Sequence, residues 1–141
     1  MKRIEVAAAV IRKDGRTLIC SRPKQSALAD FYEFPGGKCE PGETPEQCVL
    51  RELQEELGIR CRAFDRIYRL DHDYPDKSVR VIFIRCAMTS DSPPPEPCDG
   101  QDIKWVETET LAGEHFLPAD HPLAELMSKA AEKTNICNKT A

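Results

Sequence analysis

GGKCEPGETPEQCVLRELQEELGI, residues 36–59, decides the fold, because it predicts a glycine-rich loop followed by a helix whose two ends are both marked. Thr44 is a suitable N-cap, Pro45 suits the first turn, and Gln47 follows Thr44 at the spacing of a capping box. Gly58 is the expected residue where a helix ends in a left-handed turn. We therefore predict a helix that begins after Thr44 and ends before Gly58.

The predicted helix has an acidic side and an apolar side. At about 100° per residue, its acidic side carries three neighbouring glutamates, Glu52, Glu55 and Glu56. The adjacent stripe should face the core and consists of Val49, Leu53 and Leu57. Carboxylates this close repel one another unless a cation lies between them, and a hard divalent cation such as Mg²⁺ prefers oxygen ligands. The alternative is a solvated acidic surface on which Arg51 is a local partner.

The spacing of glycine and charged residues around this helix is more specific than the helix alone. Five residues separate Gly37 from Glu43, and seven more separate Glu43 from the run RELQEELGI at residues 51–59. This pattern resembles the Nudix box. The resemblance implies a hydrolase that depends on Mg²⁺, or on Mn²⁺ in its place, and that acts on a nucleoside diphosphate linked to another group.

The resemblance extends over most of the chain and is closest to MutT-type nucleoside triphosphate pyrophosphohydrolases. The segments that carry it are EFPGGK at 33–38, GETPEQ at 42–47, YPD at 74–76 and LPAD at 117–120. It implies an α/β fold, an α/β/α sandwich with a mixed β-sheet between helices. We expect a single domain over residues 1–133 and a frayed polar tail over residues 134–141.

The same resemblance implies the residues of the site. The implied metal ligands are the Gly36 carbonyl and the side chains of Glu52, Glu55, Glu56 and Asp99. The implied catalytic residues are Glu52 and Glu56, either of which could be the general base, and Arg51, which should orient the carboxylates. The implied substrate-binding residues are Arg22, Glu33, Phe34, Pro35, Gly36, Lys38 and Asp120.

Two of these assignments leave alternatives open. Asp99 stands six residues before Trp105, where relatives more often have a glutamate, and Glu96 and Asp102 are nearby substitutes. Asp120 can be either a base-reading residue or the cap of the last helix. Glu43 is expected to fix the loop rather than to bind the metal.

Outside the box, the chain reads as strands joined by turns. We predict strands over residues 4–12, 16–22, 31–35, 61–74, 78–88 and 103–107, with a hairpin turn at Asp14-Gly15. Residues 90–102 contain four prolines and should form a loop. One helical turn is expected over residues 108–112, and a final helix from residue 121 or 122 to residue 132.

Net charge, apolar runs and cysteine spacing limit the kinds of binding partner that we expect. The 141 residues carry a net charge of −4, which argues against stable nucleic-acid binding, whereas a nucleoside triphosphate can bind if metal ions carry the compensating charge. An apolar run long enough for a membrane span is absent from the sequence. Seven cysteines without a CxxC pair indicate reduced, buried thiols in a cytoplasmic protein, and Cys39 reads as a variable loop position rather than a nucleophile.

The identity of the base depends on Asp120. An ionised aspartate only accepts hydrogen bonds, so it would favour guanine, 8-oxoguanine or cytosine over thymine and uracil. Two substrates remain, oxidised (d)GTP, whose removal would sanitise the nucleotide pool and support DNA repair, or CTP and modified dCTP. A dinucleotide, a nucleotide sugar or a non-catalytic base-binding role remain alternatives, although the three retained glutamates favour an enzyme. The resemblance to MutT-type enzymes implies that its products are a nucleoside monophosphate and pyrophosphate.

Overall fold

The computed structural model describes residues 3–140, and the side chains of residues 3–134. The elements follow the chain in the order β1 (Arg3–Lys13), β2 (Arg16–Ser21), β3 (Tyr32–Glu33), β4 (Gly36–Lys38), α1 (Pro45–Leu57), β5 (Cys61–Tyr74), β6 (Lys77–Met88), β7 (Ile103–Glu107), the 3₁₀ helix η1 (Thr108–Gly113) and α2 (His121–Thr140).

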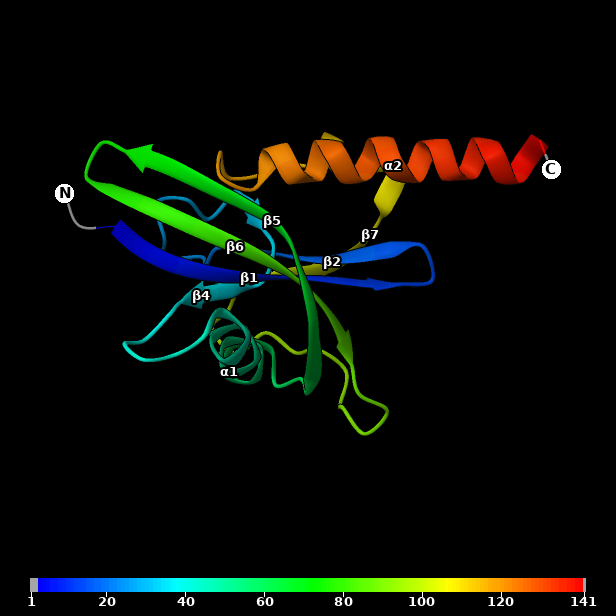
Figure 1. The fold of residues 1–141 in the computed structure, drawn as a ribbon. Coiled ribbons are helices and arrows are strands. Elements are labelled where there is room, and N and C mark those ends of the chain that lie inside the picture. The colour runs from blue at the N-terminus through cyan, green and yellow to red at the C-terminus, as the bar shows by residue number, and fades with distance from the viewer. Residues whose placement is uncertain (1–2, 141) are drawn as a thin grey trace.

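The sheet is built around β1. Its strand order is β3-β2-β1-β6-β5, with β4 paired to β1 and β7 paired to β2. β1 and β6 run parallel, whereas the other neighbours are antiparallel, so the sheet is mixed. Figure 1 shows α1 on one face of the sheet and α2 on the other. The expected α/β/α sandwich is therefore confirmed.

Each face of the sheet has its own apolar core, and successive residues of β1 alternate between them. Ala7 and Ala9 pack with the α1 stripe, in which Val49, Leu53 and Leu57 are at most 1% exposed. Ala8 and Val10 belong instead to the core beneath α2. The predicted apolar stripe of the box helix is thus in the core, as expected.

The predicted ends of α1 are confirmed. The Thr44 hydroxyl accepts from the Gln47 backbone N–H at 3.1 Å, and the Gln47 side chain accepts from the Thr44 N–H at 3.0 Å. Gly58 adopts a left-handed conformation with φ 66°. The hairpin turn is also present, since Asp14 and Gly15 both have positive φ, 53° and 78°. These features form from local sequence signals alone.

Three expectations need correction. The strand predicted over residues 31–35 is two strands, because the chain changes partner from β2 to β1 around Pro35, which has no N–H to donate. Helix α2, predicted to end at residue 132, continues to Thr140; Ala141 lies outside the described residues. Within residues 3–140, every helix is too short or too polar to cross a lipid bilayer.

The third correction concerns the cysteines. Six have free thiols, as predicted, and Cys20, Cys48 and Cys86 are buried. Cys98, however, is exposed, because it lies in the loop before β7. The side chain of Cys137 lies outside the described part of the chain.

Candidate active site

The glycines before α1 let the β4 backbone approach the β1 backbone and the Glu52 side chain closely. A Cβ atom on Gly36 would lie 2.0 Å from the Ala7 carbonyl oxygen, which no side chain could tolerate. A Cβ atom on Gly37 would lie 2.4 Å from Cδ of Glu52. The Glu52 carboxyl group therefore rests directly against the β4 backbone, and the two glycines are what make room for it.

Arg51 holds the acidic residues of the box together. Its guanidinium makes a bidentate pair with Glu43, with N···O distances of 2.7 and 2.9 Å. Nη1 donates to Glu52 at 2.9 Å and to Glu55 at 3.1 Å, and Nη2 also donates to the Lys38 carbonyl at 3.0 Å. Hydrogen bonding to Arg51 is the main cause that lowers the pKa of Glu43 to about 2. Arg51 thus orients the box, and its bidentate partner is Glu43 rather than a helix carboxylate.

Glu56 has a different environment from its two neighbours on the helix. Burial is the largest cause that raises its pKa to about 8, and the negative charges of Glu52, Glu33 and Asp99 add to the effect. A hydrogen bond with Glu52 also favours a protonated Glu56. Carboxyl groups from α1, β3 and the late loop therefore gather around Glu56, where a cation would relieve their repulsion.

The donor set suits a hard divalent cation. Across residues 3–140, no three His, Cys, Asp or Glu side chains converge tightly enough to enclose a metal ion in this conformation. The groups near Glu56 are nonetheless all oxygen donors, and Glu52 and Asp99 both act on it electrostatically. Glu55 differs in its exposure, since its side chain is 59% exposed whereas that of Glu52 is 13% exposed. The residues fit Mg²⁺, with Glu52, Glu56 and Asp99 as the most closely associated of the expected ligands.

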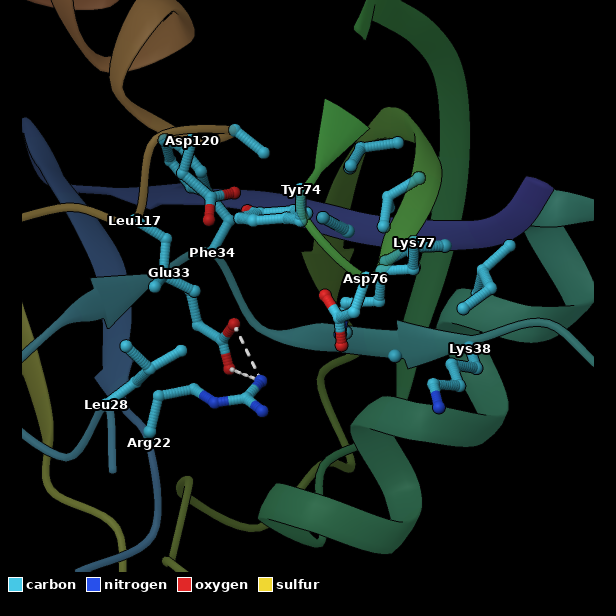
Figure 2. A pocket seen from close by; sticks show the side chains of 18 residues that line it. Arg22, Leu28, Glu33, Phe34, Lys38, Tyr74, Asp76, Lys77, Leu117 and Asp120 are labelled. Carbon is cyan, nitrogen blue, oxygen red and sulfur yellow. Dashed lines mark hydrogen bonds and ion pairs between the residues drawn. The ribbon is translucent and has the colours of Figure 1, made fainter. Parts of the chain in front are cut away.

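A cavity of about 330 Å³ opens beside β4. Six of the seven predicted substrate residues line it, Arg22, Glu33, Phe34, Gly36, Lys38 and Asp120. The exception is Pro35, whose carbonyl accepts from the Ala9 N–H at 2.7 Å instead. Figure 2 shows Asp120 and Phe34 at one end of the cavity and Lys38 at the other. A volume of this size is typical of a small-molecule pocket.

A buried carboxyl group, on Asp120, and a half-buried one, on Glu33, line the cavity. Arg22 Nη1 lies 3.3 Å from Glu33 Oε2, yet burial still raises the pKa of Glu33. Asp120 is only 6% exposed, and burial followed by the charge of Glu33 raises its pKa well above the usual range, although the Phe34 N–H opposes this. Burial therefore favours the neutral form of Asp120, which both donates and accepts, over the ionised, acceptor-only form considered from the sequence.

Asp120 occupies the cap position and the cavity together. Its backbone carbonyl accepts from the Ala124 N–H at 3.2 Å, which starts α2. Its side chain points into the cavity, beside Tyr74 (Figure 2). The backbone partner of the side chain is the Phe34 N–H, so the carboxyl group belongs to the cavity while the backbone of Asp120 begins the helix.

The hairpin between β5 and β6 adds residues that the sequence did not assign to the site. Tyr74, Asp76 and Lys77 line the cavity. Burial raises the pKa of Tyr74, whose oxygen also interacts with the Ala119 backbone N–H beside Asp120. The YPD segment was the available signal, but sequence alone gave no reason for it to fold over the end of β1.

A family model, curated relatives and solved structures were found to match this chain. A family model described as "NUDIX domain" matches residues 1–129. The chain is 36% identical to an 8-oxo-dGTP diphosphatase of Escherichia coli over 124 residues, 87% of this chain and 95% of that protein. It is 38% identical to a CTP pyrophosphohydrolase of E. coli over 126 residues, 89% and 91% of the two chains. The solution structure of the E. coli ORF135 protein matches with a TM-score of 0.76 at 34% identity, covering 89% of this chain and 88% of that one.

Proposed function

Because the chain belongs to the NUDIX domain family, we propose that it is a Mg²⁺-dependent nucleoside triphosphate pyrophosphohydrolase that releases a nucleoside monophosphate and pyrophosphate. The observation that carries the proposal is the gathering of Glu52, Glu56 and Asp99 beside a cavity lined by Asp120. One half of this arrangement suits a metal-bound polyphosphate, and the other half suits a base.

The acidic half supplies the hydrolytic chemistry. When bound, Mg²⁺ would neutralise phosphate charge and lower the pKa of attacking water. Glu52 or Glu56 would accept the proton of that water, since a carboxylate within hydrogen-bond reach suffices. Arg51 acts on this step indirectly, because Nε, Nη1 and Nη2 are already engaged by protein oxygens.

The enclosed half supplies base recognition. Neutral Asp120 would offer one donor and one acceptor, which can pair with a donor and an acceptor on the Watson–Crick edge of a guanine-type or cytosine-type base; uracil and thymine present such a pair as well, so this group would bind a base without rejecting them by itself. Apolar residues around it, among them Ile4, Phe34 and Leu117, would cover the faces of the base. Relatives named for 8-oxo-dGTP and for CTP match at comparable identity, so we propose an oxidised (d)GTP or CTP and modified dCTP as the substrates.

A hydrolysis screen tests this proposal. The protein would be incubated with 8-oxo-dGTP, dGTP, CTP, 5-methyl-dCTP, UTP and dTTP in Mg²⁺, and the products separated by ion-exchange chromatography without added pyrophosphatase. We expect one guanine or cytosine nucleotide to be preferred and pyrophosphate to appear with the monophosphate. Orthophosphate and a nucleoside diphosphate as the first products would reject it, as would turnover of nucleotide sugars alone.

A further inference from the structure

We propose that Gln101 is a positioning residue for the metal site, because its side chain ties the backbone of Asp99 to the backbone of Glu56. The inference rests on the proposed function, in which Asp99 and Glu56 are metal ligands. It concerns a residue of the late loop whose role is not evident from the box.

The side chain of Gln101 is buried and both ends of its amide are used. It is 5% exposed, which is unusual for glutamine. Its Oε1 accepts from the Asp99 backbone N–H at 2.9 Å. Its Nε2 donates to the Glu56 backbone carbonyl at 3.4 Å. One side chain thus connects the last turn of α1 to the residue that should complete the ligand set.

The last turn of α1 is the fixed end of this connection. Carbonyls there have no partner within the helix, so the loop can satisfy them. The Cys98 N–H donates to the Glu56 carbonyl at 3.0 Å, and the Glu96 N–H donates to the Leu57 carbonyl at 3.0 Å. The Glu56 carbonyl therefore accepts from both Cys98 and Gln101, and the loop caps the helix that carries the carboxylates.

The other end of the loop is fixed to β2. The Asp102 N–H donates to Ser21 Oγ at 2.8 Å, and the Ser21 N–H donates to the Asp102 carbonyl at 2.8 Å. Gln101 lies between these two anchors. Asp99 itself is close enough to Glu56 for its charge to act there.

The placement matters because Asp99 is short. An aspartate has one methylene fewer than glutamate, so its backbone must lie closer to the metal to reach it. A hydrogen bond to the Asp99 N–H restricts the backbone conformation at that residue. Removing Gln101 leaves the Asp99 N–H without this partner, and the loop can then relax away from α1.

The test measures metal binding without substrate. Mn²⁺ affinity would be determined by electron paramagnetic resonance for the wild type and Gln101→Met, which keeps the volume but removes both hydrogen bonds. We expect affinity to fall by about 10- to 100-fold, the range typical when a partner that orients a metal ligand is lost. Gln101→Asn serves as a second variant if Gln101→Met does not fold, since its amide is too short to span both backbones.

Ser128 offers a matched control. It is 7% exposed, accepts from the Ala112 N–H at 2.8 Å and donates to the Thr108 carbonyl at 3.2 Å, far from α1. Ser128→Ala should lower the melting temperature and leave Mn²⁺ affinity unchanged. If both variants lower affinity equally, the effect of Gln101 is general destabilisation and the inference is wrong.

A double variant tests the path through Asp99. After Asp99→Asn, adding Gln101→Met should cost little further affinity, because the two residues act as one unit. Losses that multiply, or an unchanged affinity in Gln101→Met, would overturn the inference. The Mn²⁺ titration uses no nucleotide, so its outcome does not depend on hydrolysis. A protein that binds Mn²⁺ but hydrolyses no triphosphate would reject the proposed function, and the effect of Gln101→Met on Mn²⁺ affinity would still test this inference.

Discussion

Asp120, which is buried, and Glu33, which is half-buried, are acidic residues on one cavity, and only Glu33 has its carboxyl group paired with Arg22. The paired group is the one better able to keep its charge, and that charge helps to raise the pKa of Asp120. The cavity can therefore hold an anion and a neutral acid side by side. The protonation of Glu33 and the protonation of Asp120 should therefore respond differently to pH.

Stability should fall as the pH rises through the raised pKa of Asp120. An acid that binds its proton more tightly in the folded protein than its ordinary pKa of 3.8 stabilises the fold fully below that value. The contribution is lost as the pH increases toward the folded pKa. Asp120→Asn removes this dependence. The melting temperature of the variant, measured by calorimetry, should therefore rise relative to that of the wild type as the pH increases from 4 to 8. A difference that stays constant across this range would contradict a neutral Asp120.

Base binding should depend on the hydrogen bonds of Asp120 rather than on its charge. Asp120→Ala leaves base groups unpaired in a buried site, which costs roughly 1–3 kcal/mol. The kcat/KM for the preferred nucleotide should then fall about tenfold or more. Asp120→Asn keeps a donor and an acceptor and should retain most of this kcat/KM. The reverse order of the two variants would show that negative charge, not hydrogen bonding, binds the base.

Glu56→Gln should separate activity from stability. The amide is nearly isosteric, yet it removes the carboxyl group that is crowded by Glu52, Glu33 and Asp99. We expect hydrolysis to fall by about 10²–10⁴-fold. In metal-free buffer at pH 8 or above the variant should melt at a higher temperature than wild type, because a repelling charge is gone, and its stabilisation by Mg²⁺ should shrink. Hydrolysis by Glu56→Gln at the wild-type rate would show that Glu56 takes no part in the reaction.

Arg51→Lys should damage the site although it keeps the positive charge. A lysine cannot make the bidentate pair with Glu43 and reach Glu52 and Lys38 as well. We expect kcat/KM to fall at least about tenfold, since small displacements of reacting groups are costly. Arg66→Lys is the control, because Arg66 makes a similar bidentate pair with Glu46 on the surface, at 2.7 and 2.9 Å. Equal losses in the two variants would show that the effect is not specific to the box.

Prediction from sequence succeeded where the signals are local. The capping box at Thr44, the left-handed Gly58 and the apolar stripe of α1 each depend on residues a few positions apart. It failed where distant segments decide the outcome. The break at Pro35 follows from a change of partner strand, and the raised pKa of Asp120 follows from burial beneath elements remote in sequence.

The late loop shows the same limit within the site. Its prolines predicted a loop, and the loop is there. Its attachment to the end of α1 through Cys98 and Gln101 depends on a contact across 45 sequence positions. The family resemblance pointed to Asp99 but left Glu96 and Asp102 open. The charge of Asp99 on Glu56 now supports Asp99 as the late-loop ligand.

The alternation of side chains along β1 has an evolutionary consequence. Val6 and Ala8 face the cavity, whereas Ala7 lies against the glycine loop and the α1 core. A single strand therefore acts as a partition between recognition and hydrolysis. Substitutions on its even-numbered side can retune which base is accepted while the odd-numbered side stays unaltered, so new specificities can arise without rebuilding the hydrolytic machinery.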